Sequence, residues 1–87
     1  MKTKQRTDWI VISGVWTGDE WEETADAFDS RDDTLAHMGN CYACGSPVWA
    51  VYHGGKRIAE VDQEKLKAEA IDGLGPISKA RALGRIP

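Results

Sequence analysis

Residues 9–28 read WIVISGVWTGDEWEETADAF, and this stretch decides the fold that we predict. Its first eight residues, from Trp9 to Trp16, are rich in β-branched and aromatic side chains, which favour a pleated strand. The composition of residues 17–20, with a central glycine, is typical of a tight turn. A second strand over residues 20–28 would close a β-hairpin in which Trp16 and Trp21 pair beside the turn.

The segment from Glu20 to Phe28 also has a helical interpretation, which stays open as the alternative. Thr17-x-x-Glu20 matches a capping box, and three apolar residues of the segment would then share one helix face. Its content of Glu, Asp and Ala also favours a helix. The Gly-Asp turn signal before the segment and the break at Asp29-Ser30 favour the strand, which we therefore predict.

The rest of the chain predicts a small α+β fold in a single domain over residues 1–87, with 1–8 and 84–87 frayed. Ser30 is a suitable N-cap for the first helix and Gly39 a suitable stop. The glycines at 54–55 supply the turn of a second β-hairpin. The elements expected after residue 28 are a helix over 30–38, a cysteine knuckle over 41–45, strands over 48–52 and 57–61, and helices over 62–72 and 76–83.

The knuckle is the sharpest chemical feature of the chain. Cys41-x-x-Cys44-Gly45 is its only Cys-x-x-Cys, and His37 and His53 stand on either side. Structural zinc takes four cysteine or histidine ligands, so the pattern His37-x3-Cys41-x2-Cys44-x8-His53 predicts a structural zinc site. The alternatives are a pair of reduced thiols or a reversible disulfide, with His37 as a helix-end histidine and His53 as a turn residue.

The segment from Cys41 to Gly45 resembles the CxxCG turns of rubredoxin-like and zinc-ribbon proteins. Those families carry a second CxxC, which this sequence lacks, so the resemblance implies a metal knuckle and no family function. A thioredoxin-like redox role is a further alternative, but such a CxxC sits at a helix N-terminus, where the thiol pKa is lowered. Here the pair follows a predicted helix and precedes a strand.

Acidic residues are concentrated before the knuckle. Residues 19–33 hold eight of them against Arg31 alone, in a chain of net charge −3. We interpret this segment as an acidic, Trp-bearing surface for a protein partner with a basic surface, although an exposed face kept soluble by charge would have the same composition. The predicted binding residues are Glu20, Trp21, Glu22, Glu23, Asp26 and Asp29.

On a strand, alternate side chains repeat every ~6.6 Å, which is close to the spacing of backbone phosphates. Glu20, Glu22, Thr24 and Asp26 would then form one row. Small inhibitory proteins of phages and mobile elements often present carboxylates in this way to nucleic-acid-binding proteins. The likeness is one of style and size.

Basic residues at the C-terminal end give the leading alternative function. Lys79, Arg81 and Arg85 could contact phosphates, as in a nucleic-acid-binding accessory protein. The acidic middle of the chain makes nucleic acid the less favoured ligand. No apolar run approaches the roughly 20 residues that span a bilayer, and no signal peptide is evident, so we expect a cytoplasmic protein without a membrane partner. The sequence as a whole predicts a non-catalytic binding or regulatory module.

Overall fold

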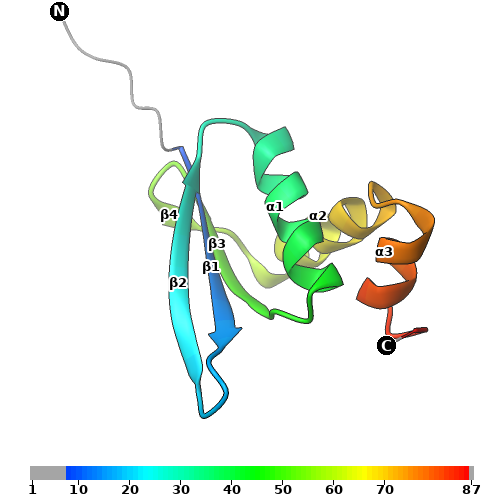
Figure 1. Ribbon diagram of the computed structural model, residues 1–87. Coiled ribbons are helices and arrows are strands. Elements are labelled where there is room, and N and C mark those ends of the chain that lie inside the picture. The colour runs from blue at the N-terminus through cyan, green and yellow to red at the C-terminus, as the bar shows by residue number, and fades with distance from the viewer. Residues whose placement is uncertain (1–7, 87) are drawn as a thin grey trace, which may run out of the picture.

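The computed structural model describes residues 8–86 and arranges them in the order ββαββαα (Figure 1). The strands are β1 (Trp9–Trp16), β2 (Trp21–Phe28), β3 (Val48–His53) and β4 (Lys56–Arg57). The helices are α1 (Arg31–Ala43), α2 (Glu60–Asp72) and α3 (Pro76–Ala82). The predicted α+β class is confirmed. Residues 1–7 and 87, which include most of the ends predicted to be frayed, lie outside the described residues.

The first hairpin is confirmed, and its second half is a strand and not a helix. β1 and β2 pair without interruption from Trp9–Phe28 to Trp16–Trp21. Thr17 N–H donates to the carbonyl of Glu20 at 3.0 Å and closes the turn. The rings of Trp16 and Trp21 are tilted at 59°, with centroids 5.4 Å apart. Pairing with the apolar β1 therefore outweighs the helical propensity of the Glu-, Asp- and Ala-rich segment.

The four strands form one antiparallel sheet in the order β2-β1-β3-β4. The predicted strand over 57–61 is wrong beyond Arg57, because β4 ends there and α2 begins at Glu60 instead of near Asp62. Ile58 donates its N–H to the carbonyl of Val51 at 2.9 Å and packs against the core, after which the chain leaves the sheet. The alternation of polar and apolar residues over so few positions fits the first turn of a helix as well as a strand.

α1 begins as predicted and ends five residues later than predicted. Ser30 caps it, since the Asp33 N–H donates to Ser30 Oγ at 3.1 Å. The expected end at Met38 is wrong, because Gly39 lies inside the helix. A Cβ on Gly39 would come within 3.0 Å of the Ala70 carbonyl oxygen and of Leu74. This glycine serves close packing of α1 against α2, and it is not a C-terminal stop.

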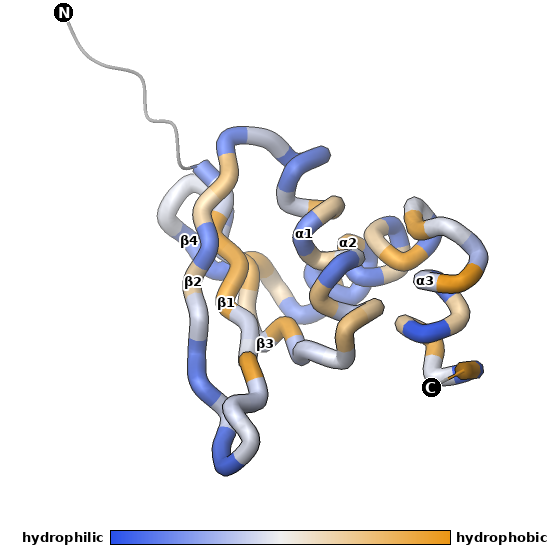
Figure 2. The backbone as a smooth tube through the Cα atoms, viewed as in Figure 1, coloured by the Kyte–Doolittle hydropathy of each residue, from blue (hydrophilic) through white to orange (hydrophobic). Residues whose placement is uncertain are grey.

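All three helices lie on one side of the sheet (Figure 1). The core between the layers holds Trp9, Val11, Met38, Val51, Leu66 and Ala70. Along the backbone, the hydrophobic colour of β1 contrasts with the hydrophilic segments of β2 beside it (Figure 2). Within residues 8–86, the helices are too short and too polar to cross a bilayer.

Candidate functional site

The strands present two faces, only one of which the helices cover. In β1, Trp9, Val11 and Ser13 are buried on the helix side, and strand alternation places Ile10 and Ile12 on the opposite side. Figure 1 shows no helix of the described residues on that opposite side. We name it the open face. Its members are Ile10, Ile12, Gly14 and Trp16 of β1, Glu23, Ala25 and Ala27 of β2, and Trp49, Ala50 and Tyr52 of β3.

A bulge shapes the centre of the open face. Ile12 pairs with Ala50 and Ser13 with Val48, so Trp49 is the extra residue of β3. A Cβ on Gly14 would lie 2.6 Å from Trp49 Cζ2, which means that the indole rests directly on the backbone of β1. Gly14 is the residue that permits this approach.

The apolar side chains of the open face surround a shallow hollow of about 540 Å³. The Arg57 guanidinium donates to the Trp49 carbonyl at 3.3 Å at its margin. The residues that line the hollow are Ile10, Ile12, Glu23, Ala25, Trp49, Ala50, Tyr52 and Arg57. The only carboxylate among them is that of Glu23, so the hollow is apolar with an acidic margin towards β2.

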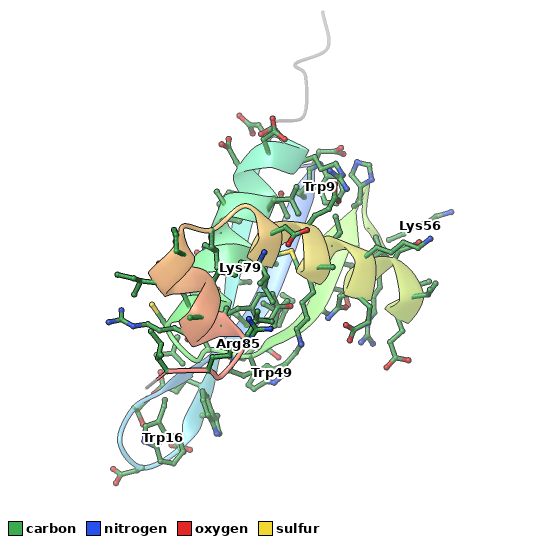
Figure 3. All side chains as sticks on the ribbon, turned by 90° about the vertical axis from the view of Figure 1, so that its right-hand side faces the viewer. Trp9, Trp16, Trp49, Lys56, Lys79 and Arg85 are labelled. Atoms are coloured by element: carbon green, nitrogen blue, oxygen red, sulfur yellow. The ribbon has the colours of Figure 1, made fainter. Side chains whose placement is uncertain are left out.

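Three of the four tryptophans are exposed on or beside this face. The exposed fractions are 53% for Trp16, 47% for Trp21 and 40% for Trp49, whereas Trp9 is buried in the core. Figure 3 shows Trp16 at the hairpin end of the molecule and Trp9 towards the opposite end. Exposed tryptophan is uncommon on a surface that contacts only water and is enriched in protein interfaces.

The predicted acidic residues are divided between the two sides of β2. Glu23 belongs to the open face, Glu20 lies in the turn and Asp29 follows the strand. Glu22 is exposed on the helix side of the hairpin end. Asp26 lies further along the same side, with its carboxylate 3.4 Å from His37 Nε2.

The predicted row from Glu20 to Asp26 is therefore partly used inside the protein. Thr24, its middle member, shares a hydrogen bond of 2.9 Å with the Ser13 hydroxyl. Helix α1 contacts the end of this row that holds Asp26. Only the other end, at Glu22, is exposed. The exposed carboxylates that remain near the tryptophans are those at the hairpin end, namely Asp19, Glu20, Glu22 and Glu23.

The cysteine pair ends α1. Cys41 is buried in the last turn, and Cys44 is the exposed C-cap residue. Both thiols are free, and Cys41 Sγ lies 3.5 Å from His37 Nε2. Burial raises the pKa of the Cys41 thiol above its usual range. Gly45 follows with a φ of +80°, which suits the turn that leads into β3.

His53, the other predicted zinc ligand, lies elsewhere. Its ring stacks on Trp9 at a centroid distance of 3.9 Å, and its Nε2 lies 2.7 Å from Asp8 Oδ2. The structure brings His37 to Cys41 and places His53 in a separate contact at the end of β3. Across residues 8–86, no three Cys, His, Asp or Glu side chains are arranged to hold a metal ion. The structural zinc site stays a prediction.

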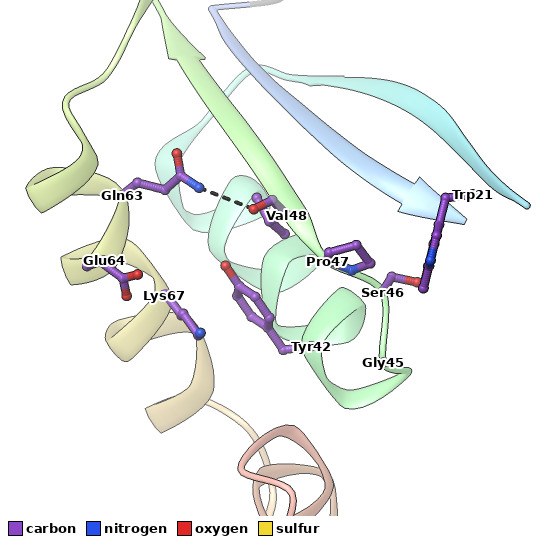
Figure 4. Close-up of a pocket in the computed structure, with 9 residues that line it drawn as sticks. All are labelled: Trp21, Tyr42, Gly45, Ser46, Pro47, Val48, Gln63, Glu64 and Lys67. Carbon is purple, nitrogen blue, oxygen red and sulfur yellow. Dashed lines mark hydrogen bonds between the residues drawn. The ribbon is translucent and has the colours of Figure 1, made fainter. Parts of the chain in front are cut away.

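A second hollow lies between the hairpin end, the end of α1 and α2 (Figure 4). It measures about 400 Å³, and Trp21, Tyr42, Pro47 and Lys67 contribute to its lining. Lys67 Nζ lies 5.2 Å from the centroid of the Tyr42 ring, a cation–π contact. Burial raises the pKa of Tyr42 to about 12, so this phenol is neutral at physiological pH.

The predicted basic helix α3 carries part of its charge in an internal pair. Lys79 Nζ lies 2.9 Å from Asp72 Oδ1, near the end of α2. Arg81 follows in the last turn of α3, and Arg85 lies just beyond the helix. Figure 3 shows Lys79 and Arg85 on this C-terminal part of the molecule.

Sequence reasoning found the hairpin tryptophans and missed other apolar residues of the open face. The missing residues are Ile10, Ile12 and Tyr52. A signal for them exists, because Trp9-Ile10-Val11-Ile12 is apolar on both faces of a strand. An antiparallel strand that covers a core on one side is usually polar on the other.

A scan against protein-family models and searches of curated proteins and of solved structures gave no significant match to this chain. Its function is therefore argued from the open face and the hairpin end.

Proposed function

We propose that this protein is a non-catalytic binding module that holds a protein partner on its open face and hairpin end. The observation that carries the proposal is the apolar character of the uncovered side of the sheet. Ile12 pairs with alanines on both sides, and Trp49 and Tyr52 extend the same surface. Contiguous apolar patches with a polar margin mark interaction sites in soluble domains.

Aromatic residues give this surface the composition of an interface. Trp16, Trp21 and Trp49 combine large apolar area with a single N–H donor, and such residues contribute most to binding free energy when they are desolvated by a partner. The Trp49 ring lies against the backbone at Gly14, and a ring packed in this way would lose little side-chain entropy on binding.

The charge at the hairpin end indicates the chemistry of the partner. Glu20, Glu22 and Glu23 lie within the turn and the first residues of β2, next to the exposed Trp21. A basic partner would meet these carboxylates, and the attraction would speed association and depend on salt. In the finer form of the proposal, the partner is a nucleic-acid-binding protein whose phosphate-binding groove takes these carboxylates.

A non-catalytic role is supported by the state of the cysteines. The raised pKa of Cys41 keeps its thiol protonated at neutral pH, and the thiolate is the reactive form. Cys41 also lies in the last turn of α1, where the helix dipole disfavours a negative charge. Two free thiols are typical of reducing compartments, so we propose the cytoplasm as the location.

Affinity capture with matched variants tests the proposal. The double variant Ile10→Thr, Ile12→Thr keeps β-branched residues in β1 and makes the open face polar. Val61→Thr makes the same kind of change on α2, where Val61 is 62% exposed. We expect the wild type and Val61→Thr to retain a common basic protein from cells of the source organism, and the double variant to lose it.

Equal retention by all three proteins would overturn the proposal, provided that circular dichroism shows the double variant to be folded. A separate binding experiment tests the nucleic-acid alternative. Binding of labelled DNA or RNA that weakens steeply with salt, and that Arg81→Gln with Arg85→Gln abolishes, would favour the accessory-protein function over a protein partner.

A further inference from the structure

The outer edge of β2 is unpaired in the described part of the chain. The sheet order places β2 at one end, and all eight of its residues pair with β1 on the inner side. In an antiparallel ladder, successive residues point their N–H and C=O groups alternately towards the paired strand and away from it. Half of the backbone groups of β2 are therefore directed outward.

Two hydrogen bonds establish which residues of β2 direct their backbone groups outward. The Thr17 N–H donates to the Glu20 carbonyl at 3.0 Å, so residues 17 and 20 form a hydrogen-bonded pair. The Gly14 N–H donates to the Pro47 carbonyl at 3.0 Å, so even residues of β1 direct their N–H groups to β3. Counted along the register, the residues of β2 that bond β1 are 22, 24, 26 and 28. The outward groups belong to Trp21, Glu23, Ala25 and Ala27.

This edge lacks most devices that protect exposed strands. Natural sheets protect such edges with proline, a bulge, lysine or a very short strand. β2 has no proline and no lysine, and its register with β1 contains no bulge. At the opposite edge of the sheet, β4 is only two residues long. What β2 does carry is negative charge, from Glu22, Glu23 and Asp26, with no basic residue.

We propose that β2 binds its partner by strand addition, with an extended basic segment pairing along the outward groups of residues 21–27. This inference rests on the proposed function and names the mode and chemistry of the contact. Lys or Arg side chains at alternate positions would face Glu22 on the helix side, while small apolar residues would continue the open face beside Ala25 and Ala27. Main-chain bonds would supply affinity and the carboxylates would select a basic segment.

A second copy of this chain is a poor occupant of the same edge. Antiparallel pairing of residues 21–27 with the same residues of another copy would place Glu22 opposite Asp26 twice. Like charges directly opposite each other destabilise a strand pair. The charges of β2 therefore oppose self-association and acidic strands, and they leave the edge open to basic ones.

Amide exchange followed by NMR tests the mode of binding. The probe is an eight-residue peptide of alternating lysine and valine, and the control peptide carries glutamate in place of lysine. We expect only the lysine peptide to bind, and binding to slow exchange at the N–H groups of Glu23, Ala25 and Ala27. The N–H groups of Thr24 and Asp26 already bond to β1, so their exchange should change little.

A backbone variant provides the second measurement. Ala25→Pro removes one outward N–H without removing a bond to β1, whereas Ala25→Val keeps that N–H and a strand-forming side chain. We expect Ala25→Pro to weaken lysine-peptide binding at least tenfold and Ala25→Val to bind like the wild type. If Ala25→Pro fails to fold, the N–H groups are removed from the lysine peptide instead, by N-methylation at its odd or at its even positions. Only one of these two peptides should lose binding.

The outcomes separate the two proposals. No binding of the lysine peptide, or binding without protection at 23, 25 and 27, overturns strand addition and leaves the open-face proposal standing. Loss of the partner in the Ile10→Thr, Ile12→Thr variant is the independent observation on which the open-face proposal depends.

Discussion

The two faces of the sheet are formed by the same strands, but one face is buried by the helices and the other stays partly exposed. On the covered face, Val11 and Val51 are fully buried against Met38 of α1. On the open face, the neighbouring Ile10 and Ile12 stay partly exposed, although they are at least as apolar. The difference shows that hydrophobic content alone does not decide burial, because burial also needs an element to cover the face.

The comparison separates residues that stabilise the fold from residues available for binding. The covered face already supplies a closed core, so the apolar residues opposite contribute less to folding and expose surface that is unfavourable in water. Truncation of a buried side chain on the covered face should therefore change stability most, and making the exposed side chains of the open face polar should mainly change binding.

The largest effect is expected for Met38→Ala on the covered side. Met38 has no exposed surface, so its truncation leaves a cavity and should lower the free energy of unfolding by about 2–5 kcal/mol. Urea denaturation followed by circular dichroism gives this value. The exposed Val61→Ala is the control and should stay within about 0.5 kcal/mol of the wild type. Similar losses in both variants would contradict the placement of Met38 in the core.

Gly14→Ala should have the next largest effect, because it disturbs the centre of the open face. The new Cβ would meet the Trp49 ring at 2.6 Å, and displacing the ring or the bulge should cost about 1–3 kcal/mol. Gly73→Ala is the matched control, since Gly73 has a φ of −77° and its Cβ would find the nearest atom at 3.6 Å. An unchanged Trp fluorescence spectrum in Gly14→Ala would show that the indole does not rest on β1.

A smaller effect is expected from the buried thiol at the end of α1. The raised pKa of Cys41 means that folding favours the neutral thiol. This contribution is present in full below the ordinary cysteine pKa of about 8.5 and is lost as the pH rises through the raised value. The free energy of unfolding should therefore decrease above about pH 8.5. In Cys41→Ala the free energy of unfolding should decrease less steeply with pH. Parallel curves for the variant and the wild type would show that the Cys41 thiol is not the cause of the decrease.

Metal removal is expected to have the smallest effect on the fold. The core around Met38 is built from side chains that are not among the predicted zinc ligands. We expect a chelator to change the melting temperature little, while elemental analysis of protein purified without a chelating tag reports the metal itself. About one zinc per chain would support the predicted site, and less than about a tenth of that, together with unchanged melting in chelator, would reject it.

The parts of the fold that were predictable depend on neighbours in the sequence. The β1–β2 hairpin follows from strand-forming residues around a short turn, and Ser30 identifies the start of α1 by local capping. The end of α1 was missed because Gly39 is explained by Ala70 and Leu74, which come from a distant part of the chain. A single sequence does not reveal such contacts.

The candidate site divides in the same way. The exposed tryptophans and the acidic turn at 17–20 could be located from composition and the hairpin. The stack of His53 on Trp9 follows from the register between β1 and β3, which includes a bulge that local patterns do not indicate. The separation of His53 from the cysteines follows from the length of β3, which has His53 at its far end, so it was open to prediction from the strand alone. The four-ligand pattern rests on sequence spacing.

The contact of Trp49 with the backbone at Gly14 also gives the protein an intrinsic fluorescent reporter. An indole that lies close to the backbone and is partly exposed should change its emission when a partner excludes water from the ring. Occupancy of the sheet surface could therefore be followed by fluorescence titration without any attached dye.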